Sequence, residues 1–118
     1  MRENPRLEIA REAANGADVI RLRGELDLTN VDALREAIGA SDATIVVLDL
    51  SLLLFVDSAG VRAIDSEHSR IAREGRRLLV VAPPASRAAW TFRIAGFSDD
   101  FVLGSLDDAV GRVTSSSS

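Results

Sequence analysis

An almost unbroken apolar run, TIVVLDL at residues 44–50, constrains the fold of this chain more than any other feature. A strand with one face in water alternates apolar and polar residues, whereas a strand covered on both faces reads as a continuous apolar run. The run LLVVA at residues 78–82, closed by Pro83-Pro84, has the same character. A helical pattern separates the two runs, and strands that alternate with helices predict right-handed crossovers in a mostly parallel sheet.

Two short alternating runs near the start of the chain predict a β-hairpin. They occupy residues 7–11 and 19–23 and flank Asn15-Gly16, a dipeptide that favours positive φ. The hairpin would add one antiparallel strand to the sheet.

Apolar residues at helical spacing predict the helices. In the first helix Val31, Leu34 and Ile38 are three and four residues apart, and Thr29 with Asp32 resembles a capping box. The other predicted segments are helices from about residue 58 to Gly75, at 86–95 and at 106–113, and a short strand at 101–103.

The predicted fold is therefore a single small α/β domain at residues 1–114. Its sheet is mixed and mostly parallel, with four to five strands of which the first is antiparallel, and about four helices flank it. The four serines at 115–118 predict a disordered tail.

Two acidic residues follow the carboxyl ends of neighbouring strands. Asp27 comes after the second strand and Asp57 after the third, and the helical crossover between these strands makes them parallel. Open α/β sheets place their binding sites at the edge where the carboxyl ends of the strands meet. The segments GELDLTN (24–30) and VDSAG (56–60) are therefore expected to form one surface.

Composition excludes several kinds of site. The chain has no cysteine, so disulfides, thiolate metal sites and a cysteine nucleophile are excluded. All fourteen basic residues are arginine, which excludes a phosphate-loop lysine and a Schiff-base lysine. A net charge of −4 disfavours direct contact with nucleic acid. The start of the chain lacks a signal peptide, and the most apolar segment is too short to cross a bilayer, so we expect a cytoplasmic protein without membrane contact.

Ser58 could be a helix cap, a catalytic nucleophile or a modification site. A nucleophilic serine needs a general base, and His68 is the single histidine. Within one helix His68 would lie about 15 Å along the axis from Ser58, which is out of reach. The segment also lacks the first glycine of a nucleophile elbow. Catalysis is therefore excluded, and chemistry alone favours the cap over the modification site.

Asp27 and Asp57 could together hold a metal ion, but two carboxylates are a weak signal for a metal site. A receiver-type phosphoacceptor site would also need a lysine, and the chain has none. His68 continues the helical stripe of apolar residues, so we expect a half-buried histidine with an ordinary hydrogen bond. We therefore expect neither a metal nor a cofactor.

Charged and aromatic residues in the second half of the chain have structural explanations. Several arginines alternate with Glu67 and Glu74 at helical spacing, which favours a solvated helix face over an anion-binding stripe. Trp90 and Phe92 are expected in the core or at its rim.

Four segments of the chain correspond, in order, to the blocks of a known family. They are RLRGELDLTNVDALREAI, IVVLDLSLLLFVDSAGVRAI, EGRRLLVVAPP and AGFSDDF. Over residues 7–110 the chain resembles STAS domains, specifically the bacterial anti-sigma factor antagonists. The most specific elements are Gly24-Glu25-Leu26-Asp27 and Asp57-Ser58-x-Gly60.

This resemblance implies a phosphorylation switch. In the family, the serine after the motif aspartate is phosphorylated by the anti-sigma factor, a serine kinase with a Bergerat-type ATP site. The unphosphorylated antagonist binds that kinase and frees the sigma factor, whereas the phosphorylated form is released. Carried over, Ser58 would be the acceptor in a non-enzymatic protein, a monomer or weak dimer. The residues expected to meet the partner are Gly24, Asp27, Thr29, Asn30, Asp57, Ser58, Ala59, Gly60 and Arg62.

The chain departs from the family pattern at two places. Ala59 stands where a second serine is common, which removes an alternative acceptor and leaves Ser58. Residues 85–95, with Trp90, match less closely. The alternative function is a STAS scaffold, or a subunit of a signalling or transport complex, without a phosphorylation cycle.

Overall fold

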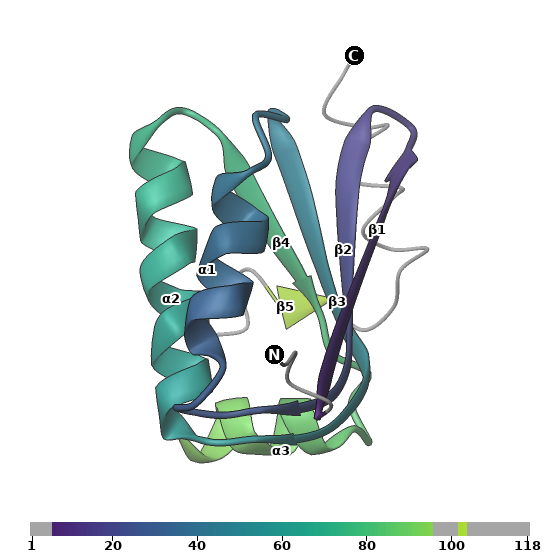
Figure 1. Ribbon diagram of the computed structural model, residues 1–118, viewed down its shortest axis with the longest axis vertical. Helices are drawn as coiled ribbons and strands as arrows, with labels where there is room; N and C mark the ends of the chain where they lie inside the picture. Colours follow the sequence, from purple (N-terminus) through teal and green to yellow (C-terminus); the bar gives the residue numbers. More distant parts are fainter. Residues whose placement is uncertain (1–5, 96–101, 104–118) are drawn as a thin grey trace, which may run out of the picture.

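The computed structural model describes residues 6–95 and 102–103, which form a mixed five-stranded sheet and three helices (Figure 1). The strand order is β1-β2-β3-β4-β5, with β1 antiparallel to β2 and all other neighbours parallel. The elements are β1 (Leu7–Ala14), β2 (Ala17–Leu26), α1 (Val31–Gly39), β3 (Ile45–Val56), α2 (Ser58–Arg73), β4 (Arg77–Val81), α3 (Arg87–Ile94) and β5 (Val102–Leu103). The predicted fold class is confirmed. The predicted helix at 106–113 and the serine tail at 115–118 lie outside the described residues.

The predicted hairpin is confirmed, and its turn has the backbone that Asn-Gly favours. Asn15 has φ 52° and Gly16 has φ 87°. Positive φ at both central residues gives the turn a twist that matches the right-handed twist of the paired strands. Both strands extend beyond the predicted runs.

Residues 45–50 of β3 are buried, as predicted for a strand covered on both faces. Leu48 packs in one cluster with buried side chains of α1, α2 and α3. Val47 points the other way and packs with Val19 and Val81 in a second cluster. Figure 1 shows α1 and α2 side by side against one face of the sheet. Of the helices in the described residues, none has the length and apolar character to span a membrane.

β3 is longer than the predicted strand because it continues past its neighbour β4. β4 pairs with residues 45–49 of β3, whereas the pairing with β2 continues, with two shifts of register, as far as Val56. α3 packs against β3 and lies across the end of the sheet at which β2 and β3 finish (Figure 1). Its Phe92 is buried and Trp90 is half exposed, which confirms the core and rim positions predicted for them.

The arginine-rich part of α2 differs from the prediction at Glu67. Arg70 forms the two ion pairs that helical spacing predicts, 2.7 Å to Glu67 and 3.1 Å to Glu74. Glu67 is only 6% exposed, so the prediction of a solvated face is wrong at this position. A carboxylate this deep requires a charged partner, which Arg70 supplies. His68, the next residue, is half-buried as predicted.

Candidate functional site

Asp57 joins the loop after β2 to the start of α2. Its Oδ1 accepts a hydrogen bond from the Gly60 N–H (2.9 Å), which makes Asp57 the N-cap of α2. Its Oδ2 accepts from the Leu28 N–H (3.2 Å). Its own N–H donates to the Leu26 carbonyl oxygen (3.2 Å). The expectation that segments 24–30 and 56–60 form one surface is confirmed by the two bonds that join Asp57 to Leu26 and Leu28.

Ser58 is the first residue of α2 and is exposed. The interpretation of Ser58 as the helix cap is wrong, because Asp57 occupies that position and its carboxylate reaches the N–H that a cap must satisfy. The Ser58 hydroxyl has no hydrogen-bond partner within the described part of the chain. It is therefore available to another molecule.

Two glycines allow the backbone to come close at this edge of the sheet. A Cβ at Gly60 would lie 2.7 Å from Val56 Cγ2 and 3.1 Å from the Leu26 side chain. A Cβ at Gly24 would lie 2.1 Å from the Arg6 carbonyl oxygen, and Gly24 has φ +104°, a conformation that only glycine adopts easily. Glycine at both positions thus has a structural reason.

The loop between β2 and α1 is held by its own polar side chains. Asn30 is 4% exposed; its Oδ1 accepts from the Asp27 N–H and its Nδ2 donates to the Glu25 carbonyl oxygen. The predicted capping box is wrong: Asn30 occupies the N-cap of α1 without a side-chain cap bond. Thr29 instead donates its hydroxyl to Asp27 Oδ1 (2.6 Å), and Arg6 pairs with Asp27 Oδ2 (3.0 Å).

These contacts hold the pKa of the Asp27 carboxyl below its ordinary value. The hydrogen bond from the Thr29 hydroxyl is the main cause, and the Thr29 N–H and the charge of Arg6 add to it, while burial opposes them. A carboxyl whose pKa is lower in the folded state stabilises the fold above its ordinary pKa. That contribution is lost as the pH falls through the folded-state pKa.

We expect Thr29→Val to raise the pKa of Asp27, because the variant removes the hydroxyl donor and keeps the side-chain shape. The variant should also be somewhat less stable than the wild type at neutral pH, and its stability should fall less as the pH is lowered. An NMR titration of the Asp27 carboxyl measures the shift. Thr91→Val is the control, since the Thr91 hydroxyl bonds the Arg87 carbonyl oxygen on α3. An Asp27 pKa equal to that of the wild type in Thr29→Val would contradict this assignment.

Nothing around Ser58 assembles a catalytic or metal centre in the described residues. His68 lies on the same unbroken helix as Ser58, about 15 Å along its axis by helical rise. The described side chains contain no group of three or more potential metal ligands. Both oxygens of Asp57 and both of Asp27 are occupied by hydrogen bonds or ion pairs, with partners in the two loops, at the start of α2 and at Arg6 before β1. These carboxylates therefore orient the surface around Ser58.

The remaining predicted residues lie on the same surface. Arg62 is exposed and follows Ser58 by four residues on α2, so the two lie on one side of the helix. Ala59 is half-buried beside Ser58. One residue was missed: Leu28, which is 71% exposed and bonded through its N–H to Asp57. Its signal in the sequence is a lone leucine between Asp27 and Thr29 in an otherwise polar loop.

The two bonds of the Asp57 carboxylate can be separated by substitution. We expect Asp57→Asn to keep the bond from Gly60, because an amide oxygen still accepts, and to lose the bond from Leu28 if its nitrogen takes the other position. Asp57→Ala loses both bonds, and a lost cap costs about 0.5–2 kcal/mol. Urea unfolding should therefore rank the wild type above Asn and Asn above Ala.

Amide hydrogen exchange checks which bond is lost in each variant. Protection of the Leu28 N–H should fall in both variants, whereas protection of the Gly60 N–H should fall only in Asp57→Ala. Equal loss at Gly60 in both variants would show that the side chain does not act as the described cap.

Comparison with known proteins gives a consistent result. A sequence model of the STAS domain matches residues 8–112. The chain is 37% identical over 103 residues to "Anti-sigma-F factor antagonist RsfB" of Mycobacterium tuberculosis, covering 84% of this chain and 83% of that protein. It is 36% identical over 87 residues to an anti-sigma F factor antagonist of Paenibacillus polymyxa, covering 69% of this chain and 74% of that protein.

A solved structure supports the same relationship. The crystal structure of an anti-sigma factor antagonist from Mycobacterium paratuberculosis superposes with a TM-score of 0.79 at 29% identity, covering 94% of this chain and 97% of that one. The described fold, the shared surface of the two motif loops and the matches along the sequence thus point to the same family. The chain belongs to the STAS domain family.

Proposed function

We propose that this protein is an anti-sigma factor antagonist whose binding to a serine-kinase anti-sigma factor is switched by phosphorylation of Ser58. The unphosphorylated protein binds the kinase in the cytoplasm and frees the sigma factor, and the phosphorylated protein is released. The names of the relatives support the antagonist role. The observation that carries the proposal is the exposed Ser58 hydroxyl at the first turn of α2, in a helix already capped by Asp57.

The position of Ser58 suits an acceptor that another protein must reach. The bonds of Asp57 to Gly60 and Leu28 fix the backbone on both sides, so the hydroxyl is presented without a loop having to open. Ala59 leaves Ser58 as the only hydroxyl in the turn. A kinase therefore meets a single, preorganised acceptor.

Charge supplies the physical basis of the switch. Phosphorylation adds about −1.5 to −2 charges at pH 7. Within the protein, the amides at the start of α2 favour an anion by about 0.3–1 kcal/mol, which offsets part of the repulsion from Asp57 and Asp27. At the interface the added charge must be desolvated, and desolvation with like-charge contact costs several kcal/mol. The added charge therefore weakens binding without refolding the domain.

The docking surface in this proposal contains the loop after β2 and the first turn of α2. Asp27 and Asp57 orient it, and Thr29 and Asn30 shape the loop. Gly24 and Gly60 permit the close backbone approach, and Ala59 and Arg62 flank the acceptor.

Incubation with purified anti-sigma serine kinase from the same genome and ATP tests the proposal, followed by intact-mass measurement. We expect one phosphoryl group on the wild type, none on Ser58→Ala, and one on Ser66→Ala, which alters an exposed serine elsewhere on α2. The absence of a phosphoryl group on the wild type with every such kinase would instead favour the scaffold function.

A further inference from the structure

We infer that an apolar patch on β3, formed by Leu52 and Leu54, anchors the partner beside Ser58 by taking up an apolar side chain flanked by a carboxylate. The inference rests on the proposed function, since the partner is the anti-sigma serine kinase of that proposal. In this inference the patch gives the partner a second contact besides Ser58, and phosphorylation does not alter that second contact. We call Leu52 and Leu54 the β3 patch.

The β3 patch exists because β3 contains two bulges. Arg21 and Arg23, two residues apart on β2, pair with Asp49 and Leu52, which are three residues apart on β3. β3 therefore contains one extra residue at this point. A second extra residue, Leu54, lies where adjacent residues of β2 pair with Leu53 and Phe55. Each bulge shifts the side chains out of strict alternation.

The bulges change which residues of β3 are exposed, because strict alternation would bury every second residue. Only every third residue, Leu50, Leu53 and Val56, points into the core. Leu54 is 72% exposed, and Leu52 is 45% exposed. Exposed apolar residues that lie together on one element mark interaction surfaces, in contrast to single scattered ones.

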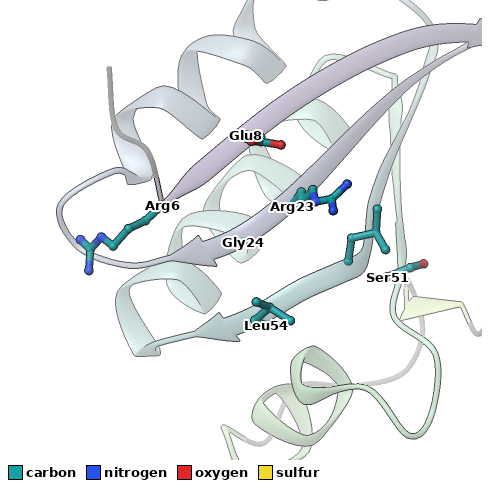
Figure 2. A pocket seen from close by; sticks show the side chains of 7 residues that line it. Arg6, Glu8, Arg23, Gly24, Ser51 and Leu54 are labelled. Atoms are coloured by element: carbon teal, nitrogen blue, oxygen red, sulfur yellow. The ribbon is translucent and has the colours of Figure 1, made fainter. Parts of the chain in front are cut away.

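A groove of about 400 Å³ adjoins the β3 patch (Figure 2). Its walls come from β1, β2, β3 and the residue before β1, and its lining residues are Arg6, Glu8, Arg23, Gly24, Ser51, Leu52 and Leu54. The groove is thus apolar along β3 and charged along β1 and β2.

The charges in the groove indicate which group of the partner lies next to its apolar side chain. Arg23 is exposed and forms no ion pair with any described residue, whereas Arg6 already pairs with Asp27 and Glu25. Glu8 lines the same groove and lies opposite Arg23 in the pairing of β1 with β2, but no ion pair joins the two side chains. The Arg23 guanidinium beside the leucines therefore favours a partner that offers a carboxylate next to an apolar group. This charge complementarity selects the kind of partner segment.

One interface can cover both Ser58 and the β3 patch. Leu54 precedes Ser58 by four residues, which is at most about 13 Å of extended chain. A standard interface covers about 800 Å² on each partner, which is ample for this separation. Leu28, in the loop after β2, is exposed and bonded through its N–H to Asp57, so it offers a further apolar side chain close to Ser58.

Binding measurements with the purified anti-sigma serine kinases of the same genome test the inference. The double variant Leu52→Ser/Leu54→Ser should bind at least about tenfold more weakly than the wild type. Arg23→Glu should bind about fivefold more weakly or worse, because it reverses the unpaired charge. Ile9→Ser is the matched control: Ile9 is a half-exposed apolar residue that pairs with the core residue Leu22, so it lies on the opposite face of the sheet.

Two further readouts separate docking from folding and from acceptor chemistry. All variants should keep the melting temperature of the wild type within a few degrees, and saturating kinase should still phosphorylate each of them on Ser58. If the double variant does not fold, Arg23→Glu alone decides the inference.

Several results would overturn the inference. If the wild type binds and is phosphorylated, but the double variant and Arg23→Glu bind equally well, the β3 patch is not the anchor and the proposed function stands. If the wild type neither binds nor is phosphorylated, the proposed function fails and the inference fails with it. If sedimentation shows a dimer that the double variant abolishes while kinase affinity is unchanged, the patch binds a second copy.

Discussion

Ser58→Glu is expected to lower the affinity for the anti-sigma serine kinase by at least about a hundredfold, because like-charge contact in a desolvated interface costs several kcal/mol and each 1.4 kcal/mol is about tenfold. Ser58 is exposed and Asp57 and Asp27 already carry negative charge beside it. The new carboxylate would therefore add to the negative charge that this surface presents to the partner. Ser58→Ala should bind like the wild type, since it adds neither charge nor bulk.

Ser66→Glu is the matched control for this effect. It places the same charge on an exposed serine of the same helix, about 12 Å farther along the axis. We expect its affinity to stay near that of the wild type, and isothermal titration calorimetry measures all four proteins. A similar loss in both glutamate variants would mean that overall charge, and not the position of Ser58, governs binding.

Gly24→Ala should produce the largest loss of stability among single substitutions at this surface. Gly24 has φ +104°, where a side chain costs about 1–3 kcal/mol. The new Cβ would also lie 2.1 Å from the Arg6 carbonyl oxygen, which accepts a hydrogen bond from the Glu25 N–H. The close contact forces the start of β1 away from β2, so this bond weakens as well.

Gly16→Ala separates backbone strain from the close contact. Gly16 has φ +87°, but a Cβ there has no neighbour within 4 Å. We expect Gly16→Ala to show the strain alone and Gly24→Ala to be clearly less stable, as measured by urea unfolding. Equal losses of stability in the two variants would show that the contact with Arg6 is relieved at no cost.

The sequence was sufficient for features that depend on long patterns or on strong local preferences. The buried runs predicted a parallel sheet, Asn15-Gly16 predicted the hairpin, and the positions of Asp27 and Asp57 predicted one shared surface. These features follow from periodicity and from the topology of parallel strands, which tertiary contacts seldom override.

Features set by local competition could not be predicted. Asp57 and Ser58 are both good cap residues, and only the backbone path decides that Asp57 caps α2. Thr29 has a capping residue type, but Asp27 and Arg6 engage its hydroxyl. Glu67 is buried because Arg70 can reach it, which helical spacing alone does not reveal.

The bulges of β3 have no signal in an apolar run. Five successive apolar residues, Leu52 to Val56, are consistent with a strand buried on both faces. In the structure Leu52, Leu54 and Phe55 are exposed, since β4 has already ended and the pairing with β2 shifts twice. The apolar surface beside Ser58 therefore becomes visible only in three dimensions.

Calorimetric titration of the kinase with this protein, before and after stoichiometric phosphorylation of Ser58, tests the central claim most directly. We predict tight binding of the unphosphorylated protein and at least about a hundredfold weaker binding of the phosphorylated one. Equal affinities of the two forms would contradict the switch.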